Sequence, residues 1–211
     1  ISGIPTVLST QTTYTIYANN TGGSSITTID VTVIDDAPYA LFYGGSPYIY
    51  TKGTAITDVT PSSLGGDVVT WSIDPALPTG LIIDSSTGTI SGTPTVLSAV
   101  TTYTVTATNT GGFDTITIDI TVNDVIPSIS YDGAPFTETK DSAMAPEAPT
   151  VGGGAILVWS VSPALPTGLT LSTTTGVITG TPTIVSSTAT YTISAENSGG
   201  IGTTTVEITV N

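Results

Sequence analysis

Acidic side chains gather at two points of the chain, each where an alternating apolar pattern ends and a proline follows. The two stretches read DVTVIDDAP at residues 30–38 and DITVNDVIP at residues 119–127. Carboxylate and amide oxygens are the ligands that Ca²⁺ prefers, and about six to eight oxygens surround each ion. The sequence therefore suggests calcium at these two points, with the candidate ligands Asp30, Asp35, Asp36, Asp119, Asn123 and Asp124.

A second interpretation of the same acids needs no metal. Asp and Asn side chains commonly accept hydrogen bonds from main-chain N–H groups in turns, and carboxylates keep the end of a sheet soluble. Sequence alone leaves both interpretations open. Calcium is the one cofactor that the sequence suggests.

The chain has few residues of the types that enzymes use for catalysis. Histidine and cysteine are absent, and the only basic residues are Lys52 and Lys140. Most general-base and nucleophilic arrangements depend on histidine or cysteine. Paired carboxylates could serve a glycosidase, but the acids here fall mainly at turns and at outward strand positions. We therefore expect no enzymatic activity and no catalytic residues.

Net charge limits the partners. Sixteen acidic residues against two basic ones give a formal charge of −14 at pH 7. Such a chain repels the phosphates of nucleic acids and of anionic lipids. No apolar run approaches the roughly 18 residues that span a bilayer. We expect neither nucleic-acid binding nor membrane insertion within this segment.

A long internal repeat organises the chain. The phrase PALPTGL occurs at 75–81 and again at 163–169, a shift of 88 residues. The same shift aligns residues 36–123 with 124–211 without a gap, and residues 1–35 match 90–124 at a shift of 89. About 88 residues suit one β-sandwich domain. We predict three parts, namely 1–35 as the C-terminal part of an incomplete repeat, and 36–123 and 124–211 as whole repeats.

Alternating patterns predict strands throughout. In residues 101–110 (TTYTVTATNT) the apolar Tyr103, Val105 and Ala107 alternate with threonines, and the run at 115–122 (TITIDITV) alternates likewise after an Asn/Gly-rich turn. Two period-2 strands joined by such a turn indicate a hairpin. The stretches VVTWSID and ILVWSVS predict a buried tryptophan strand in each whole repeat. The fold class expected is all-β, with tandem sandwich domains of about 88 residues.

The ordered motifs LP-x-GL, TG-x-I-x-GTP and N-x-GG resemble the immunoglobulin-like (cadherin/dystroglycan-like) tandem repeats of bacterial and archaeal cell-surface proteins. They stand at 77–81, 87–94 and 109–112, and again at 165–169, 175–182 and 197–200. The resemblance covers essentially the whole chain and implies Ig-like sandwiches in a stalk or adhesive array. The acidic stretches are similar to the calcium linkers of cadherin-like proteins, although the second Asn of that linker is missing.

The resemblance favours a non-enzymatic extracellular structural or adhesion protein at a bacterial or archaeal surface. Its expected partners are neighbouring repeats of the same or another chain, and a surface protein or glycan. One alternative is a carbohydrate-binding accessory module of a secreted enzyme, for which Tyr48 and Tyr50 would stack on sugars.

The incomplete first repeat raises a further alternative. Residues 1–35 contain only a final hairpin and its lead-in, and an isolated hairpin is marginal in water. It would expose Ile16, Ile26 and Val31 together with unpaired strand edges. We expect either a segment of a longer array or a self-assembling filament or sheath subunit, completed by strand complementation between chains.

Overall fold

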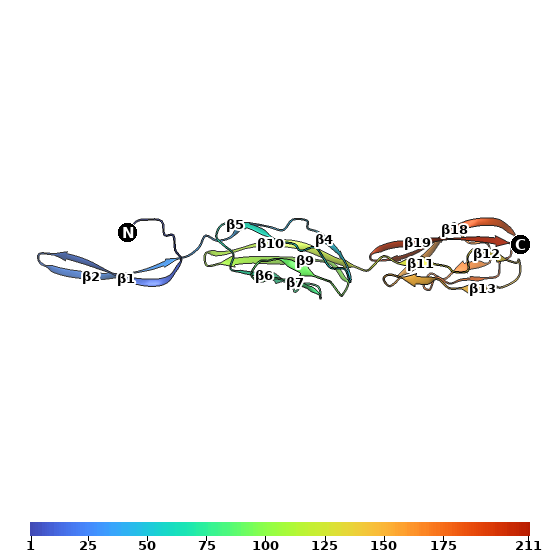
Figure 1. The fold of residues 1–211 in the computed structure, drawn as a ribbon, viewed down its shortest axis with the longest axis horizontal. Helices are drawn as coiled ribbons and strands as arrows, with labels where there is room; N and C mark the ends of the chain where they lie inside the picture. The colour runs from blue at the N-terminus through green and yellow to red at the C-terminus, as the bar shows by residue number, and fades with distance from the viewer. The chain divides into compact units, whose positions relative to one another are not determined.

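The computed structural model describes residues 1–211, and every regular element in it is a β-strand (Figure 1). Threonine, valine and isoleucine fill the strands, because side chains branched at Cβ pack well on a pleated surface. None of the secondary structure is a helix of the length and hydrophobicity needed to cross a bilayer. The all-β prediction is confirmed.

The chain divides into two compact units. Their residues are 1–48, 55–93 and 100–121 for the first unit, and 49–54, 94–99 and 122–211 for the second. The predicted limits at 35/36 and 123/124 stay a prediction. The strand pairings follow the sequence repeats.

Residues 1–123 form a hairpin followed by the strands of the second repeat. The hairpin consists of β1 (Ser9–Asn20) and β2 (Gly23–Val33). The strands of the second repeat are β3 (Tyr39–Phe42), β4 (Tyr48–Thr51), β5 (Ser62–Leu64), β6 (Thr70–Asp74), β7 (Leu81–Ile83), β8 (Ile90–Gly92), β9 (Ser98–Asn109) and β10 (Gly112–Asn123).

The third repeat has the same order of strands and one more, β13, where the second repeat has only an isolated bridge between Val59 and Ile90. Its strands are β11 (Ser128–Ser130), β12 (Phe136–Glu138), β13 (Met144–Glu147), β14 (Thr150–Gly152), β15 (Val158–Ser162), β16 (Leu169–Leu171), β17 (Ile178–Gly180), β18 (Ser186–Asn197) and β19 (Gly200–Val210).

Each whole repeat is a two-layer sandwich. In the third repeat one sheet has the order β12-β19-β18-β15, and the facing layer contains β13-β17-β16 and the pair β11-β14. The strand β12 runs parallel to β19, whereas β11-β14, β13-β17, β15-β18, β16-β17 and β18-β19 are antiparallel pairs. The second repeat repeats this plan with β4-β10-β9-β6 in one sheet and the pairs β3-β5 and β7-β8 in the other layer.

The predicted alternation is confirmed in both long hairpins. In β9 the side chains of Tyr103, Val105 and Ala107 are buried, and in β10 those of Ile118, Ile120 and Val122 are buried. The third repeat buries the equivalent residues, together with one tryptophan in the middle of the core: Tyr191, Ile193, Ala195, Val206, Ile208, Val210 and Trp159.

A tyrosine, a glycine and a tryptophan contact one another in the core of each repeat. The Tyr43 hydroxyl donates to the carbonyl of Gly88, and the Tyr43 ring meets Trp71 edge-on, with ring centroids 6.3 Å apart. A Cβ on Gly88 would lie 2.5 Å from the Trp71 indole, so only glycine fits there. Burial raises the pKa of Tyr43, helped by the nearby Tyr48.

The third repeat has the same arrangement. The Tyr131 hydroxyl donates to the carbonyl of Gly176, and Gly176 lies against the Trp159 ring. Burial raises the pKa of Tyr131 to about 12. The two buried hydroxyls therefore remain protonated donors at any physiological pH.

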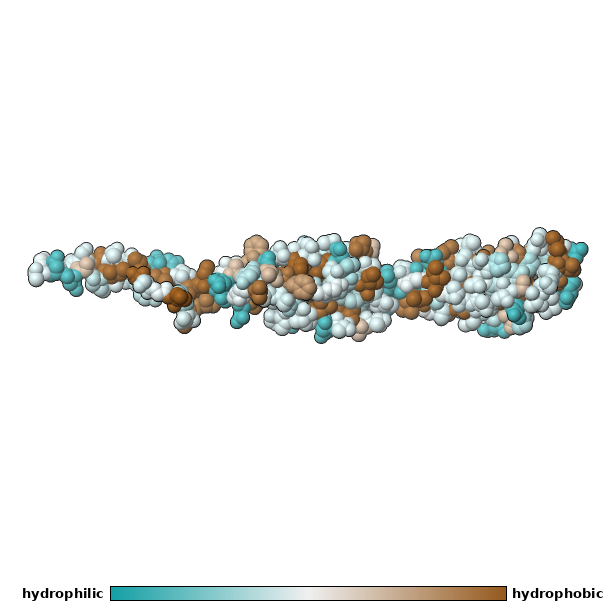
Figure 2. All heavy atoms as spheres, turned by 90° about the horizontal axis from the view of Figure 1, so that it is seen from above, coloured by the Kyte–Doolittle hydropathy of each residue, from teal (hydrophilic) through white to brown (hydrophobic).

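The β1–β2 hairpin has the register of the long hairpins but not their burial. Tyr14 pairs with Ile29 and Ile16 with Thr27 in a regular antiparallel ladder. Tyr14 is 51% exposed, whereas its equivalent Tyr103 is 3% exposed. Figure 2 shows apolar residues, coloured brown, on the surface of this hairpin at the left of the view.

Candidate functional site at the domain lead-in segments and the exposed aromatic surface

The segment leading into the third repeat is bonded to the turn between β18 and β19. The Asn197 amide nitrogen donates to the Val125 carbonyl at 2.7 Å, and the Asn197 side-chain oxygen accepts from Gly199 N at 2.8 Å. The Asp124 main-chain N–H donates to the Ser198 hydroxyl at 2.9 Å. One turn therefore holds the start of the domain against its last two strands.

The Asp124 carboxylate itself is buried and acts as a main-chain cap. One carboxylate oxygen accepts from Val125 N at 3.0 Å, and the other accepts from Ala155 N at 3.2 Å. A Cβ on Gly154 would lie 2.3 Å from the Asp124 carboxyl carbon. The glycine allows the loop to approach the carboxylate closely enough for these bonds.

The second repeat has an equivalent lead-in. The Asn109 amide donates to the Asp36 carbonyl at 2.6 Å, and the Thr110 hydroxyl accepts from Asp35 N at 3.0 Å. An Asp35 carboxylate oxygen accepts from Asp36 N at 3.1 Å. A Cβ on Gly66 would lie 2.2 Å from that oxygen.

These bonds correct the gapless alignment of the two whole repeats at their first residues. A constant shift of 88 equates Asp36 with Asp124, but the hydrogen bonds equate Asp35 with Asp124. Eight positions separate Asp35 from Tyr43, and seven separate Asp124 from Tyr131, so the second repeat carries one extra residue there.

The extra residue forms an irregularity in β3. Ala40 has a left-handed φ of 53°, and the register of β3 with β5 shifts between Tyr39 and Phe42. In a regular strand Tyr39 would share the inward face of Leu41. Instead Leu41 is buried, whereas Tyr39 is 57% exposed. The irregularity thus turns the Tyr39 ring toward solvent.

An exposed aromatic surface results, defined here as Tyr39, Phe42 and Leu64. These side chains are 57%, 60% and 58% exposed, and Tyr39 pairs directly with Leu64 across β3 and β5. The register places the small residues Ser128, Ser130 and Gly152 at the equivalent positions of the third repeat. The aromatic surface therefore belongs to the second repeat alone.

The tyrosines proposed for sugar stacking lie elsewhere. Tyr48 is buried, and its hydroxyl donates to the Gly44 carbonyl at 2.7 Å, while Tyr50 is half-buried in β4. Tyr48 therefore belongs to the core. Sequence reasoning did not single out Phe42 and Leu64, although strand alternation places Phe42 outward between the buried Leu41 and Tyr43.

Several of the six calcium candidates, which are predicted at two separate points of the chain, accept hydrogen bonds within the protein. Asp30 accepts from the side chains of Gln11 and Thr13 at 2.9 and 2.5 Å, and Asp119 accepts from Thr102 at 2.6 Å. The Asn123 main-chain carbonyl accepts from Lys52 N at 2.8 Å. No group of three or more acidic side chains in residues 1–211 is placed to hold a metal ion. Calcium at these residues stays a prediction.

A profile of the Putative Ig domain family matches residues 30–123 and again residues 120–211. The chain belongs to this family. The buried tryptophan and the bond from the tyrosine hydroxyl recur in both matched segments, and the Ig-like sandwich that the resemblance implied is confirmed.

Known proteins similar to this chain agree with that assignment. A serine-rich adhesin for platelets from Staphylococcus aureus is 31% identical over 154 residues, which are 72% of this chain, and the chain spans 7% of the length of that adhesin.

Among solved structures, extracellular domains 3–5 of Drosophila OTK match with a TM-score of 0.53 and 17% identity, over 95% of this chain and 71% of that one. The titin I-band fragment I67–I69 matches with a TM-score of 0.50 and 15% identity, over 95% and 75%. Both likenesses concern the fold.

Proposed function

We propose that the chain is a non-catalytic, load-bearing part of an extracellular stalk or adhesive array. The observation that carries this proposal is the parallel pairing of β12 with β19. Phe136 lies opposite Ile208 and Glu138 opposite Val210, and the Lys140 N–H donates to the Asn211 carbonyl at 2.8 Å. The strand β12, the first strand of the four-stranded sheet, is thus hydrogen-bonded to β19, the last strand of the repeat.

This pairing has a mechanical consequence. Tension enters the repeat upstream of β12 and leaves at the end of β19. Because the two strands are parallel, the tension pulls them in opposite directions along their length, and several inter-strand hydrogen bonds bear the load together. Resistance to forced unfolding is governed by the unfolding rate, which such a shear arrangement lowers.

The similarity to an adhesin and the net charge of the chain support a location outside the cell. The similar staphylococcal protein is described as a serine-rich adhesin for platelets. The charge of −14 keeps a surface array soluble in salt, where screening limits its self-repulsion.

Pulling geometry tests the load-bearing role. The chain has no cysteine, so single cysteines give unique attachment points. Stretching through the two ends of the chain should need at least twice the force of stretching between Ser187→Cys and the C-terminal end. The second geometry peels β18 from β19 one hydrogen bond at a time. Equal forces in the two geometries would contradict the proposal.

Ligand display on the second repeat is a second candidate function. The aromatic surface of Tyr39, Phe42 and Leu64 supports it, since exposed rings stack on sugars and fill pockets of proteins. A glycan array probed with the wild-type chain and with Tyr39→Ala and Phe42→Ala variants tests it. Saturable binding that both variants weaken supports the carbohydrate alternative, and binding that neither variant changes contradicts this surface.

A further inference from the structure

We infer that the aromatic surface of the second repeat binds the third repeat of a second copy of this chain, in a hollow over β11 and β14. Tyr39, Phe42 and Leu64 form the projecting half of this contact. The inference goes beyond ligand display, because it names a second copy as the partner. Both halves lie on whole repeats and outside the β12–β19 pair, so failure of the contact would leave the load-bearing proposal untouched.

The hollow lies on the strand pair that corresponds to β3 and β5. Ser128 pairs with Gly152 there, as Tyr39 pairs with Leu64 in the second repeat. Where the second repeat carries three large exposed side chains, the third repeat has a hollow of about 310 Å³. Its lining residues are Ser128, Ile129, Ser130, Thr150, Val151 and Gly152.

The lining of the hollow is uncharged and partly apolar. Ile129 packs against the core of the third repeat, and Val151 is 55% exposed. The exposed Asp132 carboxylate accepts from the hydroxyl of the lining residue Thr150 at 3.1 Å. A carboxylate there is an acceptor suited to the phenolic O–H of Tyr39, which aromatic rings at interfaces commonly use. The hollow therefore matches the aromatic surface in both its apolar and its polar part.

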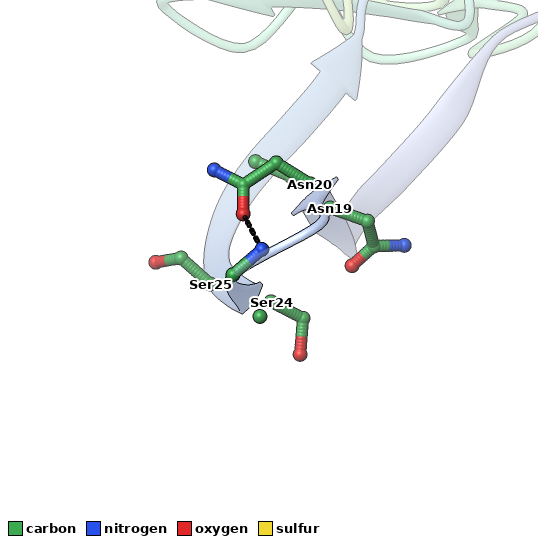
Figure 3. Close-up of a pocket in the computed structure, with 7 residues that line it drawn as sticks. Asn19, Asn20, Ser24 and Ser25 are labelled. Atoms are coloured by element: carbon green, nitrogen blue, oxygen red, sulfur yellow. Dashed lines mark hydrogen bonds between the residues drawn. The ribbon is translucent and has the colours of Figure 1, made fainter.

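A larger hollow at the turn of the β1–β2 hairpin has a different character. It measures about 570 Å³, but the side chains labelled in Figure 3 are all polar, namely Asn19, Asn20, Ser24 and Ser25. The Asn20 side-chain oxygen accepts from Gly22 N at 2.8 Å. An aromatic ring placed there would remove amide groups from water without apolar contacts in return. We therefore assign the contact to the third repeat.

The rings of the aromatic surface are restrained before any partner binds. A Cβ on Gly65 would lie 3.2 Å from the Tyr39 ring, and a Cβ on Gly44 would lie 3.4 Å from the Phe42 ring. Each ring thus lies beside a glycine of its own repeat. A side chain held in this way loses little conformational freedom on binding.

The size of the aromatic surface determines the strength of the contact. The three exposed fractions of 57%, 60% and 58%, applied to about 150–250 Å² for an aromatic side chain, give roughly 300–400 Å² in all. A stable complex buries about 800 Å² on each partner. One contact is therefore weak, with an expected Kd of about 0.1–1 mM, and many contacts in an array strengthen one another by avidity.

The two halves of the contact lie on different repeats, so the contact is heterologous. Each copy offers one projecting surface and one hollow. Contacts of this kind join each copy to the next, in a ring or an open filament. The contact thus links neighbouring chains of a surface array.

Sedimentation equilibrium of the full 211-residue chain tests the contact. The charge of −14 makes two copies repel each other, so the buffer contains about 0.5 M NaCl to screen it. Between about 0.01 and 1 mM protein, the average mass should rise above that of the monomer. Phe42→Ser removes the projecting ring, and Ser130→Phe fills the hollow. Each variant alone should associate with itself at least tenfold more weakly.

A mixture of these two variants gives the sharper result. The Phe42 ring of the Ser130→Phe variant can enter the hollow of the Phe42→Ser variant, and no third chain can follow. The mixture should therefore form a one-to-one dimer and nothing larger, which also shows that both variants fold. Phe113→Ser is the matched control, because Phe113 is 68% exposed but lies in β10 of the other sheet. It should change association less than twofold.

Three outcomes would overturn the inference. One is a wild-type chain that stays monomeric up to about 1 mM, and binding of glycans by such a monomer would assign the surface to the carbohydrate alternative. Another is association that Phe42→Ser or Ser130→Phe leaves unchanged. The last is a mixture of the two variants that forms no dimer.

Discussion

The side-chain amide of Asn197 donates a 2.7 Å hydrogen bond to the main-chain carbonyl of Val125, 72 residues earlier in the chain. Asn109 and Asp36 make the same contact in the second repeat. In both repeats the asparagine also accepts from the turn that follows it. One buried side chain thus closes the turn of the last hairpin and fixes the segment that leads into the domain.

Removing this asparagine should destabilise the repeat. Asn197→Ala leaves the Gly199 N–H and part of the Val125 carbonyl without their partner, and we expect a loss of about 1–3 kcal/mol. Urea unfolding measures it. Asn20→Ala is the matched control, because Asn20 is exposed and only the turn bond is lost. Equal losses at the two positions would contradict the role assigned to the lead-in contact.

Gly88 should tolerate no side chain. Its φ is 72°, and a Cβ would lie 2.5 Å from the Trp71 ring. Gly88→Ala should therefore lower the free energy of unfolding by about 2–5 kcal/mol. Gly53 has a φ of 78° with nothing within 4 Å, so Gly53→Ala isolates the cost of the backbone conformation, about 1–2 kcal/mol. The difference between the two variants measures the steric contact, and no difference would argue against it.

Asp84 should make the stability of the second repeat weakly dependent on pH in the acid range. Its carboxylate accepts from the Ser86 hydroxyl, Ser86 N and Thr87 N, which lowers its pKa from 3.8 to about 2. Its stabilisation is present above pH 4 and is lost as the pH falls through 2. NMR titration of the carboxyl carbon measures the pKa.

Ser172 takes the place of Asp84 in the third repeat and accepts from Thr175 N at 3.1 Å. The variant Asp84→Ser should therefore keep the turn and abolish the pH dependence between 4 and 2. An Asp84 pKa at or above 3.8 in the folded chain would contradict the hydrogen bonds described.

Calcium has a direct test. If Ca²⁺ binds at the predicted acids, 5 mM CaCl₂ should raise the midpoint of thermal unfolding relative to EDTA, because a ligand that binds only the folded state stabilises it. Asp36→Asn, at an exposed candidate, should reduce the rise. Equal midpoints in CaCl₂ and EDTA would show that the carboxylates serve as turn caps without a metal.

Much of the fold follows from the sequence because its determinants are local. Period-2 alternation specifies the face of each strand, as at Tyr103 and Val105, and N-x-GG specifies the hairpin turns. Repetition then indicates which strands share a domain. The buried tryptophans were predicted on the same basis.

The exposure of individual side chains and the role of the acidic residues could not be predicted in the same way. Whether Tyr39 faces solvent depends on one extra residue and on the left-handed φ of Ala40, which changes the alternation locally. The acids before Pro38 and Pro127 carry the same ambiguity, since a carboxylate that could bind a metal can equally cap main-chain N–H groups. The two roles are distinguished only by the hydrogen-bond donors that meet each carboxylate in the folded chain, which for Asp124 are Val125 N and Ala155 N.

Single-molecule stretching of the chain through its two ends tests the central claim most directly. Two whole Ig-like repeats in series should unfold in two separate steps. Each step should release roughly 25–30 nm, from 88 residues at about 3.5 Å per residue less the folded length. One step, or a gradual extension without distinct steps, would contradict the account of two sandwiches that bear load in series.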